Sequence, residues 1–183
     1  MSQLLLSGCI RREEVGGELM RVLIAIDDSA CSRLAIDAVV NRHWSDSTQF
    51  RVIHVVEPIV QQYGLVAPQA VELMIDAEKK LKKHGQQLLD ATSAKLQSLF
   101  GAESVGCEVL QGNVSDTIVQ NAIEWKADLI VIGSHGRTGI DRLFLGSVAE
   151  KVVNRAPCSV DVVKLKAVVT EPRTAKQVEA ASI

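Results

Sequence analysis

A glycine-rich segment in the last third of the chain has the composition of a phosphate-binding loop. Residues 133–147 read Gly-Ser-His-Gly-Arg-Thr-Gly-Ile-Asp-Arg-Leu-Phe-Leu-Gly-Ser and follow the apolar run 128–132. Glycine lets a ligand approach the backbone and adopts φ values that other residues avoid. Ser147 begins a predicted helix, and Ser147-Val-Ala-Glu150 has capping-box spacing. Because a helix N-terminus presents free N–H groups and a positive dipole end, phosphate is its natural ligand. The alternative is that the loop is only a tight turn and that Ser147 only caps its helix.

A second polar loop, Asp27-Asp28-Ser29, follows the apolar run 21–26. In open parallel sheets, ligands bind beyond the carboxyl ends of the strands, where the strand order reverses. Both loops are therefore candidate parts of one site. The alternative for Asp27 and Ser29 is helix capping, which favours the same residue types.

Strand and helix patterns alternate between these loops. Segments rich in aliphatic and β-branched residues predict strands at 21–26, 50–56, 104–110, 128–132 and 157–163. Helices are predicted at 30–42, 69–100, from Asn113 as N-cap to about Trp125, and at 147–155. This alternation predicts an α/β fold, an open five-stranded parallel sheet with helices on both faces.

The long helix carries one predicted core-facing stripe and one predicted solvated face. The stripe consists of Met74, Ala77, Leu81, Gly85, Leu88, Thr92, Leu96 and Leu99. The solvated face carries lysines at 79, 80, 82 and 83. We expect His54 to be a strand residue packed under a helix.

Length and composition limit the classes of protein. The 183 residues suit one domain, predicted at 20–165, with a flexible extension at 1–19 and a disordered tail at 166–183. Neither end is expected to be needed for folding. The net charge of −2 and 3% aromatic residues give no basis for binding nucleic acid. Four scattered cysteines read as reduced, mostly buried thiols of a cytoplasmic protein, and no apolar run is long enough to span a membrane.

The glycine spacing carries a family resemblance. Gly133-x2-Gly136-x9-Gly146-Ser147 resembles the ATP-binding signature of the universal stress protein family. The segments 22–29, 145–153 and 156–158 also resemble that family, and the likeness extends over roughly 20–164. The resemblance implies a Rossmann-like fold of the adenine-nucleotide alpha-hydrolase type, with strand order 3-2-1-4-5 and commonly a homodimer.

The resemblance also implies two groups of nucleotide-binding residues. Those along the adenosine are Ala25, Ile26, Asp27, Val55, Ile132 and Gly133. Those at the phosphates are Gly136, Arg137, Gly146, Ser147 and Val148. Asp27 would lie near the ribose or a metal ion, and Val55 would contact adenine through its backbone. The implied ligand is ATP, or ADP or AMP, with Mg²⁺ or Mn²⁺. We expect a side chain at position 146 to block the phosphates without disturbing the fold.

Three functions compete at this point. The first is an adenine-nucleotide-binding regulatory module of the stress response, in which nucleotide occupancy changes conformation or the binding of an unknown protein partner. The second is a slow ATPase, and the third is a partner-binding stress protein whose site stays empty. A fast ATPase is disfavoured because the chain has no GxxxxGKS/T loop, no lysine in the glycine segment and no evident base. His135 is expected to be a loop side chain rather than a base. Binding without fast turnover is favoured.

The fifth predicted strand is the expected dimer contact. Residues 160–163 should lie at the sheet edge, where an apolar strand can pair with its own copy. Asp161 stands where family members usually carry an aliphatic residue, and two such carboxylates facing each other would weaken the pairing.

Overall fold

The computed structural model describes residues 19–59, 68–136 and 145–165. Its strands are β1 (Arg21–Ala25), β2 (Gln49–Val56), β3 (Val105–Gln111), β4 (Leu129–Gly133) and β5 (Ser159–Val163). Its helices are α1 (Ala30–Val40), α3 (Pro68–Phe100), α4 (Val114–Trp125) and α5 (Ser147–Arg155), with a short 3-10 turn at Ala102–Ser104. The predicted fold class is confirmed, and the predicted bounds of these elements differ from the observed ones by at most two residues.

The five strands form one parallel sheet in the order β3-β2-β1-β4-β5. Ala25 of β1 pairs with Ile53 of β2 on one side and with Ile132 of β4 on the other. The chain runs outward from β1 to β2 and β3, and then crosses to β4 and β5. The strand order therefore reverses between β1 and β4, and a ligand site is expected at their carboxyl ends.

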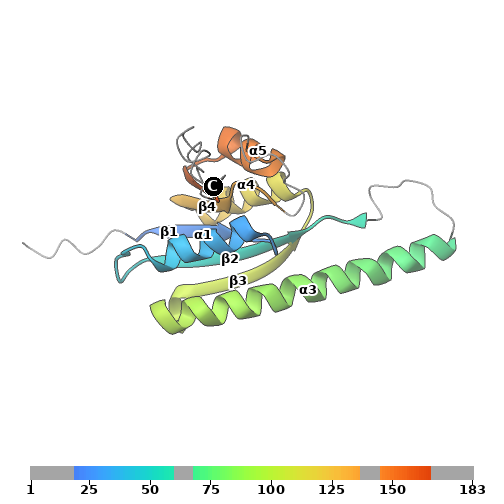
Figure 1. The fold of residues 1–183 in the computed structure, drawn as a ribbon, viewed down its shortest axis with the longest axis horizontal. Coiled ribbons are helices and arrows are strands. Elements are labelled where there is room, and N and C mark those ends of the chain that lie inside the picture. Colours follow the sequence, from blue (N-terminus) through green and yellow to red (C-terminus); the bar gives the residue numbers. More distant parts are fainter. Residues whose placement is uncertain (1–18, 60–67, 137–144, 166–183) are drawn as a thin grey trace, which may run out of the picture.

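Each face of the sheet has its own hydrophobic core. Val22 and Ile24 of β1 pack with α1 and α3 on one face, whereas Leu23 and Ala25 pack with α4 and α5 on the other. This alternation follows from the two-residue period of a strand. Figure 1 shows α3 running along one side of the sheet and α4 and α5 on the opposite side. Because β1 is covered on both faces, its sequence is apolar from Val22 to Ala25.

The predicted stripe of α3 is only partly correct. Gly85, Thr92 and Leu96 are buried, but Leu99 is 54% exposed, and the fully buried Leu89 was missed. At the end of the helix, Phe100 instead stacks on Phe50 with ring centroids 4.6 Å apart. The N-terminal part of α3 extends beyond the sheet (Figure 1), so its apolar positions have less to pack against. The four lysines of the predicted solvated face are exposed, as expected.

His54 and the cysteines test further expectations about packing. A Cβ on Gly85 would lie 2.3 Å from His54 Cδ2, so His54 packs closely against α3, as predicted. Cys31 is buried and Cys158 is half-buried, whereas Cys107 is exposed on the edge strand β3, so the described thiols are less buried than expected. Burial, together with the charge of Asp128, raises the pKa of Cys158.

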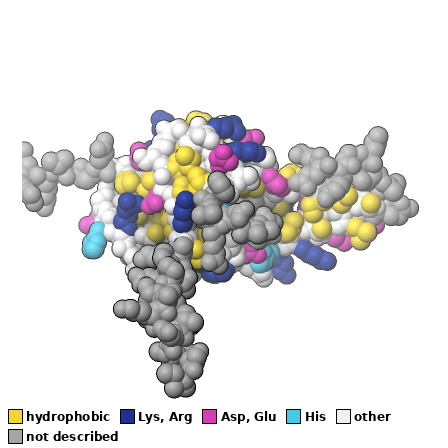
Figure 2. All heavy atoms as spheres, turned by 45° about the horizontal axis from the view of Figure 1, so that its top comes forward, with side chains coloured by type: hydrophobic (Ala, Val, Ile, Leu, Met, Phe, Trp, Pro, Cys, Tyr) yellow, Lys and Arg dark blue, Asp and Glu magenta, His cyan; other side chains and the backbone are white. Residues whose placement is uncertain are grey.

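Several sequence expectations fall outside the described residues. The predicted extension at 1–19, apart from Leu19, and the predicted tail at 166–183 are among them. In the described part of the chain, no helix is long and apolar enough to cross a membrane. Figure 2 shows basic and acidic side chains interspersed on the face that it presents, in keeping with the near-neutral net charge.

Candidate functional site

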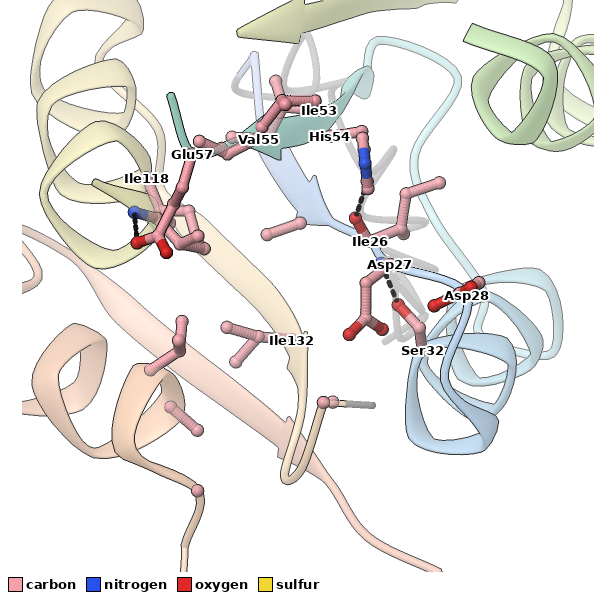
Figure 3. Close-up of a pocket in the computed structure, with 18 of the residues that line it drawn as sticks. Ile26, Asp27, Asp28, Ser32, Ile53, His54, Val55, Glu57, Ile118 and Ile132 are labelled. Carbon is pink, nitrogen blue, oxygen red and sulfur yellow. Dashed lines mark hydrogen bonds between the residues drawn. The ribbon is translucent and has the colours of Figure 1, made fainter. Parts of the chain in front are cut away.

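A cavity of about 470 Å³ lies at the carboxyl ends of β1, β2 and β4 (Figure 3). The predicted site residues that line it are Ala25, Ile26, Asp27, Val55, Ile132, Gly133, Gly136, Gly146, Ser147 and Val148. Arg137, the remaining predicted residue, lies outside the described residues. The structure thus brings the two predicted loops together with the end of β2. The volume falls within the range of about 300–1,000 Å³ that is usual for small-molecule pockets.

The loop between β1 and α1 fixes the position of Asp27. Asp27 Oδ1 accepts a hydrogen bond from Ser29 N at 3.1 Å, and Asp27 N donates to Ser32 Oγ at 2.8 Å. Ser29 is the N-cap of α1, accepting from Ser32 N at 3.1 Å. Capping therefore accounts for Ser29, whereas the Asp27 carboxylate has a turn-forming bond and also faces the cavity (Figure 3). Its carboxylate is held in place before any ligand arrives.

Hydrogen bonds tie the loop after β4 to its surroundings. Ser29 Oγ donates to the His135 carbonyl at 3.2 Å, which links the two candidate loops. Ser134 N donates to the Val163 carbonyl at 2.8 Å, and Gly146 N donates to the Ser134 carbonyl at 2.8 Å. His135 Nδ1 lies 3.0 Å from Ser134 Oγ, a local contact of a loop side chain. The start of α5 is thereby anchored beside β4.

The N-terminus of α5 differs from the predicted capping box. Gly146, not Ser147, is the N-cap, and no side chain caps this helix. Gly146 takes the extended N-cap conformation while its N–H bonds to Ser134, and Ser147 becomes the first helical residue. By contrast, Ser29 caps α1 and Asn113 caps α4, as predicted for Asn113. The first N–H groups of α5 are therefore left without a side-chain cap, next to the cavity.

The three described glycines of the signature are each constrained by the protein itself. A Cβ on Gly133 would lie 2.8 Å from the Cys31 backbone carbon, and one on Gly146 would lie 3.1 Å from the Ser134 carbonyl oxygen. A Cβ on Gly136 would meet Asp27 Oδ2 at 3.0 Å. A side chain at position 146 would therefore require the Ser134 carbonyl to shift by a few tenths of an ångström, and the expectation that the fold tolerates such a side chain stays a prediction.

The end of β2 supplies residues that the sequence analysis missed. Ile53 and Val55 face α4, and Glu57 follows at the same two-residue spacing. On the other face, His54 Nδ1 lies 2.8 Å from the Ile26 carbonyl; because a carbonyl only accepts, Nδ1 carries the proton. Figure 3 shows His54 turned toward Ile26, and Val55 and Glu57 on the opposite side of the strand. The prediction of Val55 could have revealed Ile53 and Glu57, since alternate residues of a strand share a face.

The site suits an elongated anionic ligand with an apolar part. Its wall between α4 and the sheet is aliphatic and includes Ile53, Ile118 and Ile132. The uncapped start of α5 offers N–H donors, and Asp27 offers an acceptor. Among the described residues, no group of three His, Cys, Asp or Glu side chains could hold a metal ion. A divalent cation carried by phosphates needs only one or two protein carboxylates, and Asp27 fits that requirement.

Comparison with known proteins identifies the family of this chain. The family model of the universal stress protein family matches residues 18–164. Universal stress protein MJ0531 of Methanocaldococcus jannaschii is 36% identical over 146 residues, which cover 79% of this chain and 81% of that protein.

Solved structures of universal stress proteins share the fold. UspA from Lactobacillus plantarum matches with a TM-score of 0.68 at 22% identity, covering 80% of this chain and 98% of that one. A universal stress protein in complex with cAMP matches at 0.56 and 24% identity, covering 79% and 96%. An Arabidopsis thaliana protein of the family with AMP bound matches at 0.54 and 18% identity, covering 81% and 93%. The chain belongs to the universal stress protein family.

Proposed function

We propose that this protein binds an adenine nucleotide in the cavity and acts as a regulatory module of the stress response. The observation that carries the proposal is the uncapped N-terminus of α5, which lines the same cavity as Asp27 and an aliphatic wall. Phosphates are the ligands that such a helix end favours. Structural neighbours with AMP or cAMP bound support an adenine nucleotide.

The cavity suggests how the nucleotide would lie. The phosphates would meet the N–H groups of Ser147 and Val148 and the backbone around Gly136, and the ribose would lie beside Asp27. The base would pack on Val55 and the aliphatic wall. A Mg²⁺ or Mn²⁺ ion, if the phosphates carry one, would find its protein ligand in Asp27.

Binding without fast hydrolysis is the form of this proposal that the side chains support. The chain has no GxxxxGKS/T loop and no lysine in the glycine-rich segment 133–147. Fast phosphoryl transfer usually requires such a cation against the transferred phosphate. Nucleotide occupancy would then change conformation or the surface offered to a partner.

The free thiols of Cys31, Cys107 and Cys158 suit a cytoplasmic location.

Calorimetric titration of nucleotide-stripped protein with ATP, ADP and AMP, with and without Mg²⁺, tests the proposal. We expect saturable binding, and Asp27→Ala should weaken it by about tenfold or more, since a hydrogen bond to a charged group contributes about 1.5–3 kcal/mol. Asp90→Ala on the exposed surface of α3 is the matched control and should bind as the wild type does. Absence of binding by the wild-type protein at millimolar nucleotide would refute the proposal.

We also propose that β5 pairs two copies of the chain. β5 lies at the sheet edge, and Asp161 is at its centre. Arg42 Nη1 lies 3.4 Å from Asp161 Oδ2. Each Asp161 carboxylate therefore has a counter-charge in its own copy, which reduces the repulsion between the two Asp161 carboxylates across a two-fold axis.

Asp161→Leu should tighten the dimer, because it removes the repulsion that remains between the two carboxylates across the axis. Sedimentation equilibrium of both proteins gives the dissociation constants. A wild-type protein that stays monomeric at high micromolar concentration would contradict the pairing, and an unchanged constant in the variant would contradict the role of Asp161.

A further inference from the structure

His54 binds the carbonyl group of Ile26 at the point where the chain leaves β1. Ile26 is the first residue after β1, and it directly precedes Asp27. Its N–H donates to the Ile53 carbonyl at 2.9 Å, and its carbonyl accepts from His54 Nδ1 at 2.8 Å (Figure 3). Two adjacent residues of β2 thus bind both backbone groups of Ile26. The first bond is a backbone bond that almost any sequence allows, whereas the second requires a side chain that donates.

Gly85 of α3 leaves the space that the imidazole ring of His54 occupies. A Cβ on Gly85 would lie 2.3 Å from His54 Cδ2 and 3.0 Å from His54 Nε2. Because Gly85 is buried, the ring has no room to swing away from Ile26 on that side. The ring is therefore held between the backbone of α3 and the Ile26 carbonyl.

The bond from His54 fixes the peptide unit that leads into Asp27. This unit contains the Ile26 carbonyl and the Asp27 N–H, and it is planar. The carbonyl accepts from His54 on β2, and the N–H donates to Ser32 Oγ of α1 at 2.8 Å. Ile26 is only 5% exposed. Without His54, a buried carbonyl would lose its partner, and the peptide unit would be free to rotate toward another donor.

We propose that His54 is a positioning residue for Asp27: its Nδ1–H holds the peptide unit that directs the Asp27 carboxylate into the cavity, and nucleotide affinity depends on this bond. The inference rests on the proposed function, in which Asp27 lies beside the ribose. His54 acts through Asp27 rather than on the ligand, because Ile26 occupies its Nδ1 and its other edge lies against Gly85.

The test compares two replacements of His54 by calorimetric titration with ATP. Asparagine can place an amide N–H close to the position of Nδ1, whereas leucine has a similar volume and cannot donate. His54→Leu should weaken ATP binding about threefold to tenfold, the effect of one hydrogen bond, and His54→Asn should restore most of the affinity. His43→Leu is the matched control: His43 is exposed beyond the end of α1, and this variant should bind ATP as the wild type does.

A double-mutant cycle shows whether His54 acts through Asp27. In the Asp27→Ala background, His54→Leu should change ATP affinity by less than about twofold, because the carboxylate that His54 positions is absent. A general loosening of the fold would instead lower the affinity by the same factor in both backgrounds. Equal factors in the two backgrounds, or an unchanged affinity in His54→Leu alone, would overturn the inference.

The outcomes separate this inference from the proposed function. A wild-type protein that binds no adenine nucleotide refutes both. A wild-type protein that binds ATP, with a cycle that shows no coupling between His54 and Asp27, overturns this inference alone. A measurement on the unaltered protein covers a variant that fails to fold. Nitrogen-15 spectra of the His54 imidazole should show a proton on Nδ1, and a proton on Nε2 alone would overturn the inference.

Discussion

Replacing Gly133 with alanine is expected to destabilise the protein even when no ligand is present. The new Cβ would lie 2.8 Å from both the backbone carbon and the Cβ of Cys31, and 3.0 Å from Ser32 N. These atoms belong to the first turn of α1, which Ser29 and Asp27 hold through hydrogen bonds to Ser32. Because backbone must move, we expect a loss of about 1–3 kcal/mol, as for other overpacked sites.

Thermal unfolding of the ligand-free protein measures this effect. A loss of that size should lower Tm by about 2–4 °C for each kcal/mol in a protein of this length. Gly106→Ala is the matched control, because a Cβ there meets no heavy atom within 4 Å on the edge strand β3. If both variants melted at the same temperature as the wild type, the contact with α1 would not exclude a side chain at position 133, and this prediction would be contradicted.

Ser147→Asp is expected to move stability and nucleotide affinity in opposite directions. Ser147 is exposed, begins α5 and does not serve as its cap. A carboxylate in the first turn should stabilise the free protein by about 0.3–1 kcal/mol through the helix dipole. The same charge occupies the place proposed for the phosphates, so ATP affinity should fall by about tenfold or more, at least about 1.4 kcal/mol.

Two controls isolate the charge at this position. In Ser147→Asn, the new side chain has nearly the same shape as aspartate but carries no charge, so this variant should retain most of the ATP affinity. Gln87→Glu adds one negative charge at an exposed position on α3, and it should leave ATP affinity unchanged. Melting temperatures and calorimetric titrations of the three variants give both quantities. ATP affinity that stays within twofold of the wild type in Ser147→Asp would show that the phosphates do not bind at α5.

The strands could be predicted because burial on both faces leaves a plain pattern. β1 and β4 are apolar at nearly every position, and their residues are buried accordingly. The strand order could not be predicted from the residue pattern. It followed from the resemblance carried by the glycine spacing, since alternating strands and helices are compatible with several orders.

Other features depend on contacts that no local pattern contains. Leu99 fits the helical period but is exposed, because Phe100 takes the packing position against Phe50. Gly146 became the N-cap of α5 through its bond to Ser134. Glu57 was missed because its bonds to Asn113 and Val114 join residues more than fifty positions apart. Gly133 was assigned to the ligand, and no local pattern could show that a Cβ there would also lie 2.8 Å from Cys31 of α1.

The most direct test of nucleotide binding at this cavity is a titration of nitrogen-15-labelled protein with ATP, observed through assigned backbone amide resonances. The proposal requires saturable shifts at Ser147, Val148 and Gly136, where the phosphates would lie, and at Val55, where the base would lie. Amides of the distant strand β3, such as Cys107, should not move. Resonances that stay in place at millimolar ATP, or that move only outside the cavity, would contradict the account.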